Sequence, residues 1–179
     1  MPKPFNMKKS LFLILFLLPI LSKVNAQTIV GNDVVSLKTF TTLLSDDVKA
    51  EKLDNYFTPL GYKFTGMENI SRHGMQGHQF TYKGDHSDFK IDLIGRLKLD
   101  VIYETLIADE YNSILTHILS TNTYKMVDHA DSGLATSETF ANTEYTFVFM
   151  TKKTQTGTQY SINAASKLNN IVVNVDNNQ

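Results

Sequence analysis

The chain of 179 residues contains no cysteine, and this absence excludes several classes of protein at once. A disulfide framework, a thiolate zinc site, a cysteine nucleophile and a lipidated N-terminal cysteine all require that residue. Tryptophan is also absent, and of the four prolines only Pro59 lies beyond residue 26. Residues 27–179 contain no linker rich in proline, glycine or serine, so we expect them to form a single globular domain.

An excess of charge of one sign is lacking as well. The 17 basic residues nearly balance the 18 acidic ones, and 42% of the chain is hydrophobic. This composition is typical of an ordered globule and lacks the basic footprint of a nucleic-acid-binding protein. We therefore expect no nucleic acid among its partners.

The N-terminal segment has the three parts of a secretory signal peptide. Met7-Lys8-Lys9 is basic, Leu11 to Leu21 is almost unbroken apolar sequence, and Val24-Asn25-Ala26 supplies small residues before a mature start at Gln27. An apolar run of about 11 residues is too short to cross a bilayer, which takes about 20. The sequence therefore predicts a signal peptide over residues 1–26 and a periplasmic or secreted protein. The alternative is an uncleaved membrane anchor.

Cleavage would change the charge of the protein. The leader carries four lysines and no acid, so the mature chain has 13 basic and 18 acidic groups and a formal charge of −5. That charge favours solubility and disfavours an anionic membrane surface. We expect no membrane span after cleavage.

Residues 34–105 show a pattern of helices followed by strands. Leu37 to Leu44 carries a short helical stripe of apolar residues, although it also fits a strand. A second helix is predicted to begin at Ser45-Asp46-Asp47 and to end at Pro59-Leu60-Gly61. Strands are predicted at residues 62–65, 78–83, 89–93 and 97–104. Alternation places Phe80, Tyr82, Phe89, Ile91 and Leu93 on a buried face, and Lys83, Lys90 and Asp92 toward water.

Residues 106–175 repeat this plan. Asp109 is predicted to cap a helix with an apolar stripe formed by Tyr111, Ile114, Leu115, Ile118 and Leu119. Strands are predicted at residues 124–127, 144–151, 158–164 and 170–174, as counterparts of the four strands of the first half. The polar stretch Asp128 to Asn142 is predicted to be a binding loop.

The predicted fold class is α+β, with two α-β-β-β-β repeats and helices packed on one face of antiparallel sheet. This element order resembles the tandem αβ repeats of the β-lactamase-inhibitor-protein-like folds over most of residues 34–175. The resemblance implies a sheet whose exposed face binds another protein, in an inhibitor-like or immunity-like role. The cysteines usual in that family are absent from this chain.

The strands of the second half also suggest where a partner would bind. Tyr145, Phe147 and Phe149 alternate with neutral residues, so both faces of their strand are apolar or neutral. If helices cover one face, the other face presents an exposed neutral patch of the kind that marks binding sites. The predicted binding residues are Thr146, Val148, Met150, Ser161 and Asn163. The alternative is a central strand covered on both sides.

Signs of catalysis are scarce. The chain contains neither a G-x-S-x-G nor an H-E-x-x-H motif. His73, His78 and His86 fall within residues 73–88 and could hold a metal, and Asp85 with Asp88 or Asp109 with Glu110 could form a carboxylate pair. Loop histidines and turn or helix-start carboxylates explain these residues more simply. We predict no cofactor and a non-enzymatic interaction protein, with a metal- or carboxylate-dependent periplasmic enzyme and a carrier of a small apolar ligand as alternatives.

Overall fold

The computed structural model describes residues 35–45, 48–72, 74–95 and 97–167. The predicted leader at residues 1–26, His73 and the strand predicted at residues 170–174 lie outside the described residues. Within the described ranges, no helix is both long enough and apolar enough to cross a membrane.

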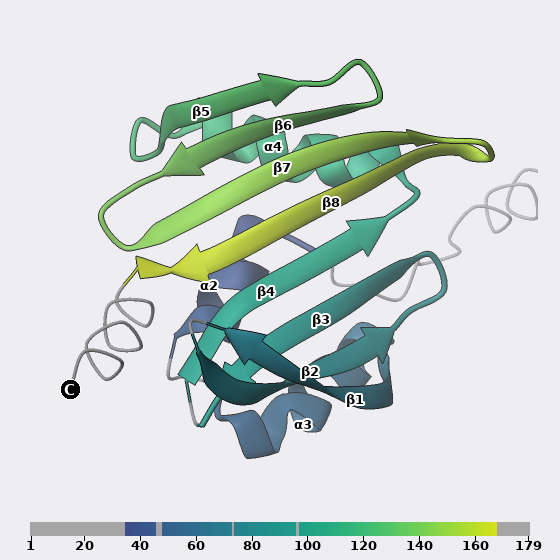
Figure 1. The fold of residues 1–179 in the computed structure, drawn as a ribbon, viewed down its shortest axis with the longest axis vertical. Coiled ribbons are helices and arrows are strands. Elements are labelled where there is room, and N and C mark those ends of the chain that lie inside the picture. Colours follow the sequence, from purple (N-terminus) through teal and green to yellow (C-terminus); the bar gives the residue numbers. More distant parts are fainter. Residues whose placement is uncertain (1–34, 46–47, 73, 96, 168–179) are drawn as a thin grey trace, which may run out of the picture. The chain divides into compact units, whose positions relative to one another are not determined.

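Within the described residues, eight antiparallel strands form one sheet in the order β1-β2-β3-β4-β8-β7-β6-β5 (Figure 1). The first four are β1 (Lys63–Arg72), β2 (Met75–Lys83), β3 (Ser87–Ile94) and β4 (Leu97–Thr105). The second four are β5 (Lys125–Asp131), β6 (Ala135–Ala141), β7 (Tyr145–Thr154) and β8 (Gly157–Ser166). Each set is a meander, and its last strand pairs with the last strand of the other set at the centre of the sheet.

In the described part of the chain, three α-helices accompany the sheet: α2 (Leu37–Leu44), α3 (Leu53–Phe57) and α4 (Ala108–Ser120). Short 3₁₀ turns at Ala50–Lys52 and Thr58–Leu60 flank α3. Gly61 ends this segment in the left-handed conformation with φ 85°, which glycine adopts without steric cost. The mixed helix and strand content confirms the α+β class, and the stripe from Leu37 to Leu44 forms a helix.

The core lies between the helices and one face of the sheet (Figure 1). Two cross-strand rows of the sheet face the helices: Tyr82, Phe89, Tyr103, Ile162 and Phe149 in one, and Phe80, Ile91, Val101, Ala164, Phe147 and Phe140 in the other. Phe40 of α2 contacts the rings of Phe89, Tyr103 and Phe147, and so joins both halves of the sheet. Burying each such ring contributes about 1.5–3 kcal/mol.

Helix α4 packs on the sheet through the predicted apolar stripe, but the predictions for Leu119 and for Asp109 are wrong. Tyr111, Ile114 and Ile118 are buried, whereas Leu119 is 60% exposed. The residue preceding the helix is Ile107, so Asp109 lies in the first turn and not at the cap. Its carboxylate still lies near the positive end of the helix dipole.

The first half contains a longer edge strand than predicted. The residues predicted as a short strand, 62–65, begin a strand of ten residues that continues to Arg72. The stretch Gly66-Met67-Glu68-Asn69-Ile70 shows no clean alternation of apolar and polar side chains because β1 is exposed along most of its length. Periodicity predicts a strand only where one face is buried.

In the second half, the prediction of a binding loop from Asp128 to Asn142 is wrong. This stretch contains the end of β5 and the whole of β6, joined by a tight turn in which the Ser132 N–H donates to the Ala135 carbonyl. Along β6 only Phe140 is buried. The strand predicted at residues 144–151 is consequently the third strand after α4, and the one predicted at 158–164 is the fourth.

Candidate functional site

The face of the sheet that points away from the helices carries the predicted binding residues. Their strand neighbours Phe147, Phe149 and Ile162 are buried against the helices, so alternation turns the predicted residues to the opposite side. In the β7–β8 register, Val148 lies opposite Asn163 and Met150 lies opposite Ser161. The structure therefore brings the predicted residues together on one face.

The register extends this group onto β6. Thr139 lies opposite Val148, Ser137 opposite Met150, and Ala141 opposite Thr146. We call the combined set the neutral face; it consists of Ser137, Thr139, Ala141, Thr146, Val148, Met150, Ser161, Asn163 and Ala165. The set contains no charged side chain, and most of its members are small. No helix of the described part of the chain lies over it (Figure 1).

Two members of the neutral face have unusual surroundings. The Met150 side chain is 40% exposed, although it lies on an interior strand of the sheet. The side-chain oxygen of Asn163 is buried, and it accepts no hydrogen bond from any described residue. A buried acceptor without a donor costs about 1–3 kcal/mol. The fold tolerates this cost at the centre of the face.

The same face differs on strands β2–β4, where the corresponding register positions hold charged or polar side chains at every position except Ile102. We call this set the charged face; it consists of Gln79, Thr81, Lys83, Asp88, Lys90, Asp92, Asp100, Ile102 and Glu104. Lys90 Nζ lies 2.9 Å from Glu104 Oε2, and Lys83 Nζ lies 3.9 Å from Asp88 Oδ2. Most of its charges thus have a partner within the protein.

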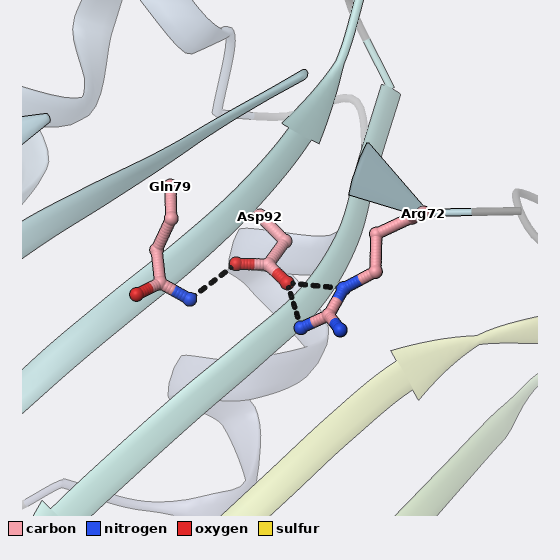
Figure 2. A network of polar contacts seen from close by, with 3 residues as sticks. All are labelled: Arg72, Gln79 and Asp92. Atoms are coloured by element: carbon pink, nitrogen blue, oxygen red, sulfur yellow. Dashed lines mark hydrogen bonds and ion pairs between the residues drawn. The ribbon is translucent and has the colours of Figure 1, made fainter. Parts of the chain in front are cut away.

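A buried carboxylate lies at the end of the charged face. Asp92 is fully buried; its Oδ2 accepts hydrogen bonds from Arg72 Nε at 3.0 Å and Nη2 at 2.8 Å, and its Oδ1 accepts one from Gln79 Nε2 at 2.7 Å. Figure 2 shows the carboxylate between the amide and the guanidinium. The hydrogen bond from Arg72 to Asp92 is the main cause that raises the pKa of Arg72.

This arrangement corrects the prediction that Asp92 faces water. Its side chain does point to the predicted side, but Arg72 at the end of β1 reaches across β2 and covers it. Alternation along a strand predicts the side of the sheet to which a residue points, but it does not predict whether another side chain covers that residue. The contact fixes the end of the β1–β2 hairpin on β3.

Polar groups also meet where α4 begins, on the helix side of the sheet. Glu110 accepts hydrogen bonds from the Tyr103 hydroxyl and, at 2.9 Å, from Thr105 Oγ1, while Tyr62 Oη lies 2.7 Å from Ser87 Oγ. Burial raises the pKa of Tyr103 and of Tyr62. Glu110 is therefore bound to the sheet, so this member of the candidate carboxylate pair has a structural role.

The histidines of residues 73–88 do not gather at one point among the described residues. His78 lies in β2 opposite Leu93, whereas His86 lies in the turn after the end of β2. The five residues of strand from His78 to Lys83 span about 17 Å, and His86 follows Lys83. The described part of the chain contains no group of three His, Cys, Asp or Glu side chains that could hold a metal.

Comparison with known proteins adds no relative. No family model, no curated protein and no solved structure matches this chain.

Proposed function

We propose that this protein is an exported binding protein that presents the neutral face to a protein or peptide partner. The observation that carries the proposal is the neutral face itself, an uncharged set of side chains on the side of β6, β7 and β8 away from the helices, which ends at Lys152, the next residue of β7 on that side after Met150. A partner that covers it desolvates hydroxyl, methyl and thioether groups and no ion, which keeps the cost of binding low. Met150 adds an adaptable apolar contact.

The strand order supports a second part of the proposal, that the chain is a tandem duplication. Helical segments precede a four-stranded meander in residues 37–105 and again in residues 108–166, and the two meanders meet through their last strands. This plan resembles that of the β-lactamase-inhibitor-protein-like folds, and the inhibitor-like or immunity-like role that we propose rests on this analogy of fold alone. The leader predicted at residues 1–26 is the reason that we propose a periplasmic or secreted location for this activity.

The proposal is tested with a charge on the neutral face. The chain is tagged at its C-terminus and used to capture partners from envelope and culture fractions, and each captured protein is identified, purified and titrated. Met150→Glu is expected to keep the melting temperature within a few degrees and to weaken binding of that partner at least tenfold, since it buries an unpaired charge in the interface.

Thr156→Glu in the exposed β7–β8 turn is the matched control and should bind like the original chain. Unchanged affinity of Met150→Glu for every captured protein would contradict the proposal. Unfolding of this variant would place Met150 in a core. The alternatives of a metal- or carboxylate-dependent enzyme and of an apolar-ligand carrier stay predictions, tested by elemental analysis and by native mass spectrometry of the purified protein.

A further inference from the structure

A separate pocket lies at the other edge of the molecule, between β1 and the segment that includes α3. Its lining residues are Ala50, Glu51, Asp54, Phe64, Phe80 and Tyr82, and its volume is about 230 Å³. We call it the edge pocket. It lies on the helix side of the sheet, so it shares no residue with the neutral face.

The floor and one wall of the edge pocket are aromatic. The Phe64 ring centroid lies 6.2 Å from that of Phe80 and 5.6 Å from that of Tyr82. Phe64 is 48% exposed, and Met67 farther along the same strand is 53% exposed. Large apolar side chains are therefore left open to solvent next to a hollow that could take another side chain.

Two carboxylates complete the lining, and none of the described residues that line the pocket is basic. Asp54 Oδ1 accepts a hydrogen bond of 2.6 Å from the Tyr82 hydroxyl, and Glu51 lies one helical turn before it. The neighbouring Lys63 belongs by strand alternation to the opposite face from Phe64. Carboxylates beside exposed aromatic rings favour a cation, which the ring faces and the acids attract together.

The backbone beside the pocket is also available. Strand β1 is the first strand in the sheet order, and among the described strands it pairs with β2 alone. From Gly66 to Arg72 its register with β2 is continuous, so the N–H and C=O groups of its outer side form a regular edge. An extended peptide can add to such an edge as a further strand.

We propose that β1 and the edge pocket bind an extended peptide and that the pocket receives one arginine side chain of that peptide. The guanidinium stacks on Phe64 and Phe80 and donates hydrogen bonds to Glu51 and Asp54. Arginine fits better than lysine because its planar group can stack on a ring and bind a carboxylate with two donors at the same time. A neutral side chain would leave both acids without a cation.

The proposal is tested by titrating the full chain with a blocked peptide of sequence Thr-Val-Thr-Arg-Thr-Val-Thr and with the same peptide carrying glutamine in place of arginine. Amide chemical shifts report the site, and their titration gives Kd. We expect the arginine peptide to bind about tenfold more tightly than the glutamine peptide. The largest shift changes should lie on β1 and at residues 50–54.

Glu51→Gln and Asp54→Asn should each remove much of the preference for arginine. Glu51 tests the idea apart from folding, because its carboxylate is exposed and Asp54 alone receives the Tyr82 hydrogen bond. Glu144→Gln, which removes an exposed carboxylate in the turn before β7, is the matched control and should bind the peptide normally. Equal affinity for both peptides, shift changes away from β1, or no binding of the arginine peptide at millimolar concentration would overturn the proposal.

Discussion

The two halves of one sheet face differ in chemistry although they share one backbone geometry. Across the β4–β8 pairing, Ile102 lies opposite Asn163 and Glu104 lies opposite Ser161. On the β4 side the rows continue through Lys90, Asp88 and Asp92, and on the β8 side they continue through the small residues of the neutral face. The change from charged to neutral occurs at one strand boundary.

The two faces also differ in whether their polar side chains have partners within the protein. On the charged face, ion pairs and hydrogen bonds within the protein satisfy the side chains, and a partner would have to break or desolvate them. On the neutral face, a buried amide oxygen has no donor among the described residues. The neutral face is therefore the better candidate for docking.

The largest effect is expected from breaking the buried pair of the charged face. Arg72→Met leaves the Asp92 carboxylate with one hydrogen bond and should lower the free energy of unfolding by about 3 kcal/mol, because a buried charge loses its counter-ion. Urea unfolding measures this change. Replacing both residues, as Arg72→Met with Asp92→Leu, should recover most of the loss. A single variant as stable as the original chain would show that the pair does not hold the hairpin.

Alkaline pH should weaken the first half before the second. Burial, together with the hydrogen bond to Asp54 for Tyr82 and to Glu110 for Tyr103, raises the pKa of both tyrosines above the ordinary value of 10.0. The neutral hydroxyl is favoured in the folded state, so this stability is complete below pH 10.0 and is lost as pH rises above it. At about pH 11 each tyrosine should cost about 1 kcal/mol.

Hydrogen exchange measured against pH should show β2–β4 opening first. In the second half, burial raises the pKa of Tyr111 to about 12, so the loss at this residue matches that of the other tyrosines up to that pH and stops growing above it, whereas the first half has two such tyrosines in Tyr82 and Tyr103. Tyr82→Phe should move the alkaline unfolding midpoint upward. Simultaneous opening of both halves, unaffected by this variant, would contradict the prediction.

A smaller effect, of opposite sign, is expected on the neutral face. Asn163→Leu removes an unpaired buried acceptor and should raise the free energy of unfolding by about 1 kcal/mol, measured by urea unfolding. Asn142→Leu is the contrasting variant, since Asn142 Oδ1 accepts hydrogen bonds from the N–H groups of Glu144 and Tyr145, and it should destabilise. Destabilisation by Asn163→Leu would mean that the amide is satisfied in solution.

The smallest effect is expected for the half-exposed pair of Lys90 and Glu104. A double-mutant cycle with Lys90→Met and Glu104→Gln should give a coupling free energy of about 0.5 kcal/mol, because solvent screens such pairs. The coupling should fall as salt is added. A coupling as large as that of Arg72 with Asp92 would show that the charged face is less hydrated than its exposure indicates.

Much of the fold was predictable where one face of an element is buried and the other is wet. Helix α4 and strands β2, β3 and β4 all have this contrast, and their apolar periodicity identified them. Strand β6 lacks it, because its outer residues are small and neutral and only Phe140 is buried. A strand whose outer residues are small and neutral has the sequence pattern of a polar loop. The same lack of charged and large apolar side chains that defines the neutral face therefore prevented the prediction of β6 as a strand.

The placement of the candidate site was predictable in part. Alternation around Phe147 and Phe149 was enough to put Val148 and Met150 on the helix-free side. The contribution of β6 and the cover of Arg72 over Asp92 depend on pairing between distant segments, which periodicity does not contain. The edge pocket was missed for the same reason, since its lining comes from residues 50–54, β1 and β2.

The most direct test of the neutral face uses the absence of native cysteine. Met150→Cys and Thr81→Cys each place one thiol on the same side of the sheet, in the neutral and the charged half. Alkylation rates of the two thiols are measured with and without a captured partner at saturation. The account predicts strong slowing at position 150 and little change at position 81. Equal slowing at both positions, or slowing at position 81 alone, would contradict it.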